Sequence, residues 1–134
     1  MKVVLDTNVM LLIVSKQSPF RWIFDLFLAE KFTLCVTTDI LDEYAEIIGD
    51  HMGAQVVEDL MNTLEESENV EYVTRYFRWN LISTDPDDNK FVDCAISCNA
   101  QYIVTEDKHF QIIKQMPYLN LNIVGIEEFR KIFI

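Results

Sequence analysis

The sequence predicts an α/β protein in which helices cover both faces of a central, mainly parallel sheet, giving a three-layer α/β/α fold. Short apolar runs alternate along the chain with longer segments whose apolar residues recur at helical spacing. This alternation is typical of parallel sheets, because a parallel strand pair needs a crossover connection, usually a helix. We expect residues 1–134 to form one domain, since no repeat or linker divides them. The predicted strands are residues 3–5, 34–36, 70–73, 102–104 and 121–124.

The N-terminal part of the chain predicts two helices after the first strand. Residues 3–5 are all aliphatic and indicate a short buried strand that Asp6 ends. The apolar segment that follows predicts a helix capped by Thr7 or Asn8, since both types cap helix N-termini. Pro19 then opens a second helix, because proline suits the first helical position.

The middle of the chain predicts a helical hairpin. Thr38 or Asp39 caps a helix that runs to residue 48, and Gly53 begins another with its apolar residues on one face. No strand pattern separates the two helices. We therefore expect residues 38–67 to form an αα-hairpin that protrudes from the sheet.

The C-terminal part returns to the alternating pattern. Residues 84–89 are rich in Asp, Pro and Asn, which indicates a turn that caps a helix at 91–98. The strand at 102–104 is followed by a short helix at 109–113. The strand at 121–124 is followed by a last helix at 126–133.

The charge and the apolar pattern limit the class of protein. The net charge is -11, whereas phosphate-binding proteins usually present a basic surface. Metal cations, a basic partner, or a local basic strip must therefore compensate if the substrate is a nucleic acid. Candidates for such a strip are Lys16, Arg21, Lys90 and Lys108. No apolar run approaches the roughly 20 residues of a membrane span, and the N-terminus lacks a signal-peptide pattern, so we expect a cytoplasmic protein.

The cysteines predict free thiols. There are three, Cys35, Cys94 and Cys98, and an odd number without a secretion signal argues against a disulfide framework. Cys94 and Cys98 stand four apart, but no second Cys or His pair occurs at zinc-ligand spacing. The expectation is that all three are small buried residues.

Acidic residues follow two of the predicted strands, which places them where open α/β sheets bind ligands. Asp6 ends the first strand and Asp107 closely follows the fourth. Asp93 lies in an otherwise apolar helix, where a charge needs a partner or a cation. Glu43 lies on the helix that starts at residue 38. Taken singly, each has a structural explanation: a helix cap for Asp6 or Asp107, a solvated side chain for Glu43, or a pair with Lys90 for Asp93.

A cluster of these acids would need divalent cations. Two carboxylates about 5 Å apart repel by about 3 kcal/mol at an effective dielectric near 20. Magnesium and manganese prefer oxygen ligands, and two such ions can activate water and stabilise the leaving oxygen of a phosphodiester. The sequence contains neither a phosphate-binding glycine loop nor a Ser–His pattern. We therefore expect metal-dependent hydrolysis.

Four segments together resemble the PIN-domain family, in particular VapC-like toxins of prokaryotic type II toxin–antitoxin pairs. They are residues 4–9, 38–44, 85–93 and 102–107. The resemblance implies a magnesium- or manganese-dependent endoribonuclease, often homodimeric and often silenced by a cognate antitoxin. It makes Asp6, Glu43, Asp93 and Asp107 the catalytic and metal-binding residues. It makes Thr7, Asn8, Asn89 and Thr105 groups that hydrogen-bond these carboxylates or the RNA substrate.

Two alternatives remain open at this point. The strong acidity also fits a catalytically degenerate PIN-fold module that binds a basic partner. A phosphatase of the haloacid-dehalogenase type also places an Asp after its first strand, but it needs a second Asp where this chain has Asn8. Glu106 departs from the PIN pattern, because a small residue or Arg is common there, and its charge is expected to assist metal binding or weaken RNA approach.

Overall fold

Five parallel strands form one sheet in the computed structural model, which describes residues 1–74 and 77–133. The strand order is β3-β2-β1-β4-β5, with every neighbouring pair parallel. The strands are β1 (Lys2–Leu5), β2 (Thr33–Val36), β3 (Val70–Tyr72), β4 (Tyr102–Val104) and β5 (Asn122–Val124). Each predicted strand is confirmed to within one residue at either end.

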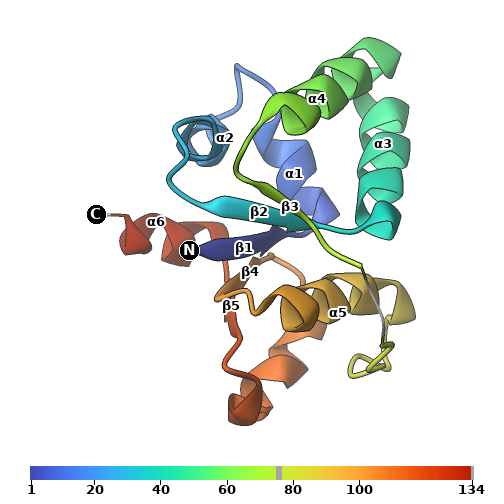
Figure 1. Ribbon diagram of the computed structural model, residues 1–134, viewed down its shortest axis with the longest axis vertical. Helices are drawn as coiled ribbons and strands as arrows, with labels where there is room; N and C mark the ends of the chain where they lie inside the picture. The colour runs from blue at the N-terminus through green and yellow to red at the C-terminus, as the bar shows by residue number, and fades with distance from the viewer. Residues whose placement is uncertain (75–76, 134) are drawn as a thin grey trace.

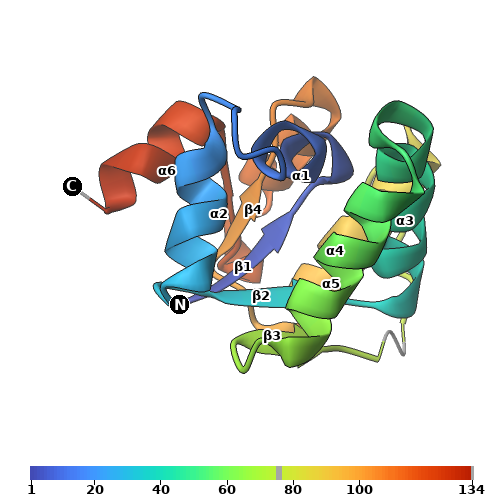
Figure 2. The same ribbon diagram turned by 90° about the horizontal axis from the view of Figure 1, so that it is seen from above.

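Helices lie on both faces of this sheet, which confirms the predicted three-layer α/β/α fold. The helices are α1 (Thr7–Ile13), α2 (Arg21–Leu28), α3 (Thr38–Met52), α4 (Ala54–Glu66), α5 (Asn89–Cys98) and α6 (Ile126–Ile132). Figure 1 shows α1 to α4 above the sheet and α5 below it. Figure 2 shows α3 and α4 side by side as the expected helical hairpin. The predicted helix at 109–113 is part of a 3₁₀ helix, Lys108–Gln115. None of the described helices is long and apolar enough to cross a membrane.

The strand order creates a switch point beside the central strand. From β1 the chain moves outward through β2 to β3, with its connecting helices on one face of the sheet. It then returns through α5, on the other face, to β4 on the opposite side of β1. The carboxyl ends of β1 and β4 therefore lie side by side. The connection that leaves β1 leads to β2 on one side, and the connection that leaves β4 leads to β5 on the other side. Such a switch point is where open α/β sheets bind ligands.

Four helix starts differ from their predictions. α2 begins at Arg21, two residues after Pro19, and α5 begins at Asn89 instead of residue 91. The other two differences concern the capping residues of α3 and α1. The cap of α3 is Thr37, whose Oγ1 accepts a hydrogen bond from the Ile40 backbone amide at 3.3 Å; Thr38 and Asp39 are already helical. The N-cap position of α1 is Asp6, but its side chain makes no capping hydrogen bond. The strand ends one residue before each cap, so a shift of one residue reassigns the capping side chain. The Asp6 carboxylate is left available for other contacts.

Tyr44 connects α3 to the end of the central strand. Its side chain is fully buried, and its hydroxyl donates a hydrogen bond to the Leu5 backbone carbonyl. Burial is the main reason that the pKa of Tyr44 lies well above its usual range, so the hydroxyl remains a donor. Leu5 directly precedes Asp6, and this contact therefore fixes the backbone from which the Asp6 side chain projects.

Replacing Tyr44 by Phe tests this contact. Tyr44→Phe should lower the free energy of unfolding by about 1–3 kcal/mol, because a buried hydrogen bond is lost without opening a large cavity. Urea unfolding followed by circular dichroism measures the change. Tyr118→Phe is the matched control, since Tyr118 is 73% exposed and should change stability little. Equal stability of Tyr44→Phe and the natural chain would contradict the structural role given to this hydroxyl.

Candidate functional site

Asp6 and Asp107 meet at the switch point through Thr105. The Thr105 hydroxyl donates to Asp6 Oδ2 at 2.7 Å, and its oxygen accepts from the Asp107 backbone amide at 3.0 Å. Asp6 and Thr105 are both buried. Asp107 caps the following 3₁₀ helix, because its Oδ1 accepts from the His109 backbone amide at 2.9 Å. One threonine therefore links two acids whose positions in the chain lie far apart.

Glu43 reaches the same region from α3, and both of its carboxylate oxygens are held. Oε2 accepts a hydrogen bond from the Thr7 hydroxyl, and Oε1 lies 2.7 Å from Lys90 Nζ. The Glu43 and Lys90 side chains are largely shielded, at 24% and 16% exposure. Thr7 starts α1 and Lys90 lies in the first turn of α5. Three helices thus fix the position of the Glu43 carboxylate.

Asp88 is a further buried acid at this site. Its Oδ2 accepts no hydrogen bond from the described residues and lies 3.6 Å from His109 Nδ1. His109 Nδ1 also lies 3.2 Å from Asp107 Oδ1 and 3.6 Å from Asp85 Oδ2. One ligand atom from each of Asp85, Asp88, Asp107 and His109 lies within 4.8 Å of the others, an arrangement that could hold a metal ion.

Burial and neighbouring negative charges raise the pKa of Asp6 and of Asp88. For Asp6, burial raises the pKa most, the hydrogen bond from Thr105 opposes it, and the charges of Asp107 and Glu43 raise it further. For Asp88, burial and then the charges of Asp107, Asp85 and Asp6 raise the pKa to about 7, against a smaller lowering by His109. Asp6 therefore senses Asp107 and Glu43, and Asp88 senses Asp6, Asp85 and Asp107. The four acids Asp6, Glu43, Asp88 and Asp107 are called the acidic cluster below.

Asp93 has a different environment from this cluster. It is 1% exposed, and its Oδ1 accepts a hydrogen bond from the Trp79 backbone amide at 3.1 Å. A helix rises about 1.5 Å per residue, so Asp93 lies about 7 Å farther along α5 than Asp88 at its start. The lysine proposed as its partner, Lys90, is instead paired with Glu43.

The remaining predicted residues take separate positions. Asn8 is exposed in the first turn of α1. Asn89 is buried, and its side-chain amide bonds the Ile82 backbone, donating to the carbonyl at 2.9 Å and accepting from the amide at 2.8 Å. This pair anchors the segment before α5. Glu106 points to the start of α6, where Oε1 accepts from the Ile126 backbone amide at 2.7 Å.

The predicted basic strip is dispersed. Lys90 joins the acidic cluster through Glu43, and Lys108 is exposed beside Asp107. Lys16 and Arg21 line a separate cavity of about 530 Å³ that also includes α4 residues. The cationic side chains near the acids are therefore fewer than the sequence suggested.

Sequence reasoning did not assign Asp88 to the cluster, nor did it place Asp85 and His109 beside Asp88 and Asp107. The available signal was helix direction: α5 runs antiparallel to β4, so its first residues lie at the carboxyl edge of the sheet and its later residues recede. An acid before the helix was therefore better placed for the switch point than one in its middle. The apolar neighbours of Asp93 in the sequence predicted that it is buried, and the structure confirms this. Burial alone does not predict how far a residue lies from the carboxyl edge of the sheet.

Comparison with known proteins agrees with this fold. The sequence profile of the PIN domain matches residues 2–109. VapBC2 from Rickettsia felis, solved bound to a DNA fragment from its promoter, is 20% identical with a TM-score of 0.62, covering 92% of this chain and 98% of that one. VapC20 from Mycobacterium tuberculosis, described as a sarcin-ricin loop cleaving toxin, is 12% identical with a TM-score of 0.58, covering 83% and 94%. No curated protein sequence matches the chain.

The profile match spans most of the chain and includes every acid of the cluster. It also removes the support for a haloacid-dehalogenase-type phosphatase, which rested on Asp6 alone. The chain belongs to the PIN-domain family.

Proposed function

We propose that this PIN domain is a metal-dependent endoribonuclease, the toxin of a toxin–antitoxin pair, with its active site at the switch point of the sheet. The observation that carries the proposal is that Asp107 belongs both to the link with Asp6 through Thr105 and to the group that contains Asp88, while the charge of Glu43 acts on Asp6. Likeness to a cleaving toxin supports the nuclease assignment. The acidic cluster also supports the proposed dependence on a divalent cation, because such an ion would relieve the repulsion between the carboxylates.

The residues fit magnesium or manganese. The donors are carboxylate oxygens, which hard cations prefer, and Asp88 Oδ2 is buried without a hydrogen-bond donor among the described residues. Asp6, Asp88 and Asp107 would hold the principal ion, directly or through water. This assignment replaces Asp93 by Asp88, because Asp93 contacts the Trp79 amide. When bound, such ions supply an acidified water and stabilise charge on the leaving oxygen of a phosphodiester.

The chain's own groups would orient the reaction. Glu43, held by Thr7 and Lys90, is positioned to accept a proton from the attacking water or to hold a second ion. Thr105 fixes Asp6 relative to Asp107. Asn89 would act indirectly, because its side-chain amide anchors the backbone segment that precedes Asp88. Asn8, exposed beside Asp6, is a candidate for contact with the RNA backbone.

The proposal includes two protein partners. Likeness to VapBC2 supports a cognate antitoxin, and the net charge of -11 favours a partner with a basic docking segment. A homodimer belongs to the same proposal through the family resemblance. The alternative, a catalytically degenerate acidic module, is favoured by the dispersed basic residues and is an outcome of the first experiment below.

Asp6→Asn tests the metal assignment. This variant should bind manganese about tenfold or more weakly in calorimetry, because a ligand is removed while the Thr105 contact can be kept. Cleavage of a random-sequence RNA pool with manganese present should fall by about a hundredfold or more. Asp87→Asn is the matched control, since Asp87 is exposed and carries the same charge.

The outcomes separate the alternatives. Unchanged manganese affinity in Asp6→Asn would refute the role of Asp6. Manganese binding by the natural chain without cleavage of any RNA in the pool would replace the nuclease by the degenerate binding module.

Asp88→Asn and Asp93→Asn decide which acid of the third segment holds the ion. We expect Asp88→Asn to weaken manganese binding by about tenfold or more, whereas Asp93→Asn keeps the affinity within about threefold. Asp93→Asn should instead lower the free energy of unfolding by about 1–3 kcal/mol, because a buried acceptor is weakened. Calorimetry and urea unfolding on the same samples measure both quantities. The reverse pattern would restore Asp93 as the ligand.

A further inference from the structure

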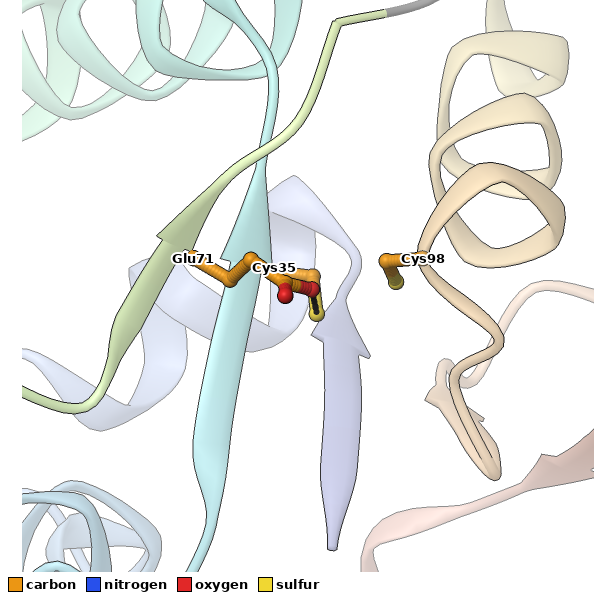
Figure 3. Close-up of side chains that lie close together, drawn as sticks. All are labelled: Cys35, Glu71 and Cys98. Atoms are coloured by element: carbon orange, nitrogen blue, oxygen red, sulfur yellow. Dashed lines mark hydrogen bonds between the residues drawn. The ribbon is translucent and has the colours of Figure 1, made fainter.

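Two cysteines and a glutamate converge on the face of the sheet that α5 covers. Cys35 of β2 pairs in register with Glu71 of β3, so both side chains project from the same face. Figure 3 shows them pointing toward Cys98, the last residue of α5. The Cys35 thiol donates to Glu71 Oε2 at 3.5 Å, and the ligand atoms of all three residues lie within 4.8 Å of one another.

A lysine orients the glutamate within this group. Lys2 Nζ lies 3.0 Å from Glu71 Oε1 and donates to the Cys98 backbone carbonyl at 3.2 Å. Glu71 therefore gives one oxygen to Lys2 and presents the other to Cys35. In metal sites, a carboxylate that binds the ion is often oriented in the same way, by a hydrogen bond to its other oxygen from a residue that does not touch the metal.

The charges of the group are suited to a divalent cation. Cys35 and Cys98 are buried at 0% and 6% exposure, and two thiolates beside a carboxylate would repel strongly there. Two thiolates, one carboxylate, Lys2 and a divalent cation would sum to zero charge.

The group is reachable from the surface. Lys2, Glu71 and Cys98 line a cavity of about 570 Å³ together with the aromatic residues Tyr72, Phe77 and Trp79. Two of the three proposed ligand residues, Glu71 and Cys98, therefore border the cavity, whereas Cys35 is fully buried and does not line it. Water in this cavity can supply a further ligand.

We propose that Cys35, Cys98 and Glu71 form a second metal site, for a thiophilic divalent cation of the zinc class, distinct from the acidic cluster. Two sulfurs and one carboxylate oxygen suit zinc, which is commonly bound by four ligands, the fourth here being water. Zn–S bonds of about 2.3 Å place tetrahedral sulfurs about 3.8 Å apart, so small side-chain rotations close the group around an ion. Binding displaces the thiol protons of the ligating cysteines to solvent.

The site would tie three elements together at one end of α5. Cys98 ends the helix whose start follows Asp88, so one helix connects the two sites. β2 and β3 would be joined to that helix by coordination as well as by packing. The spacing of these residues in the sequence did not predict the group, because its members come from two strands and a helix and do not form one local motif.

Cobalt(II) titration of the reduced full chain tests the proposal. Thiolate ligation gives an intense sulfur-to-cobalt charge-transfer band, which the all-oxygen acidic cluster does not give. We expect this band to saturate at one cobalt per chain and to be displaced by zinc. Cys35→Ser and Cys98→Ser should each abolish it, and Asp6→Asn should retain it. Cys94→Ala is the matched control, since Cys94 is buried on the same helix but outside the group, and it should retain the band.

The contrary results are distinct. No thiolate band in the natural chain, or a band that survives both Cys35→Ser and Cys98→Ser, would overturn the proposal. If either serine variant fails to fold by circular dichroism, Glu71→Gln decides instead. Its side chain is 39% exposed, and it should weaken cobalt binding by about tenfold. Unchanged cobalt affinity in Glu71→Gln would then reject the site.

Discussion

Repulsion among carboxylates at the carboxyl edge of the sheet is the constraint around which this molecule is organised. Parallel strands all end at the same edge, and the strand order reverses beside β1. Asp6 and Asp107 follow the two strands on either side of that reversal, β1 and β4, and Asp88 precedes α5, which leads into β4. Burial and mutual charge raise the pKa of Asp6 and of Asp88, so the folded chain bears a cost that a bound cation would remove.

Neutral and cationic partners hold this cluster in place without neutralising it. Thr105 joins Asp6 to Asp107, and the Lys90 ammonium group pairs with Glu43. The Tyr44 hydroxyl fixes the backbone just before Asp6. Among these partners, the Lys90 ammonium group brings one full positive charge to Glu43, and the His109 ring lies beside Asp88 and Asp107. The remaining negative charge is what makes a metal site the best-supported interpretation of the geometry.

The fold and part of the site could be predicted from sequence because their signals are local. An aliphatic run that stops at Asp6 gives both the strand and the position of its acid, and the same holds for residues 102–107. Glu43 was singled out among the acids of its helix by the resemblance to the PIN-domain family, and not by a local signal. The cap of this helix was assigned to Thr38 or Asp39 instead of Thr37, because strand ends are not defined by sequence to one residue.

Contacts that depend on packing direction were not predictable in the same way. Asp88 and Asp93 are five residues apart in the sequence. The distance of each from the carboxyl edge of the sheet depends on the direction of α5, which composition does not reveal. Cys35 and Glu71 become neighbours only through the register of β2 and β3. Glu106 was expected near a metal or the RNA, but its carboxylate caps α6, which comes 20 residues later in the chain.

The stability of the chain as a function of pH, with and without manganese, tests the central claim most directly. In the folded chain the pKa of Asp88 is raised from 3.8 to about 7, so this proton is kept at pH values where the unfolded chain has lost it. In EDTA, the free energy of unfolding should therefore fall between about pH 5 and pH 7.5, by about 1–3 kcal/mol more than in Asp88→Asn. Manganese should offset this loss at the upper pH. A stability that rises over the same range in parallel with Asp88→Asn, and that manganese leaves unchanged, would contradict the account.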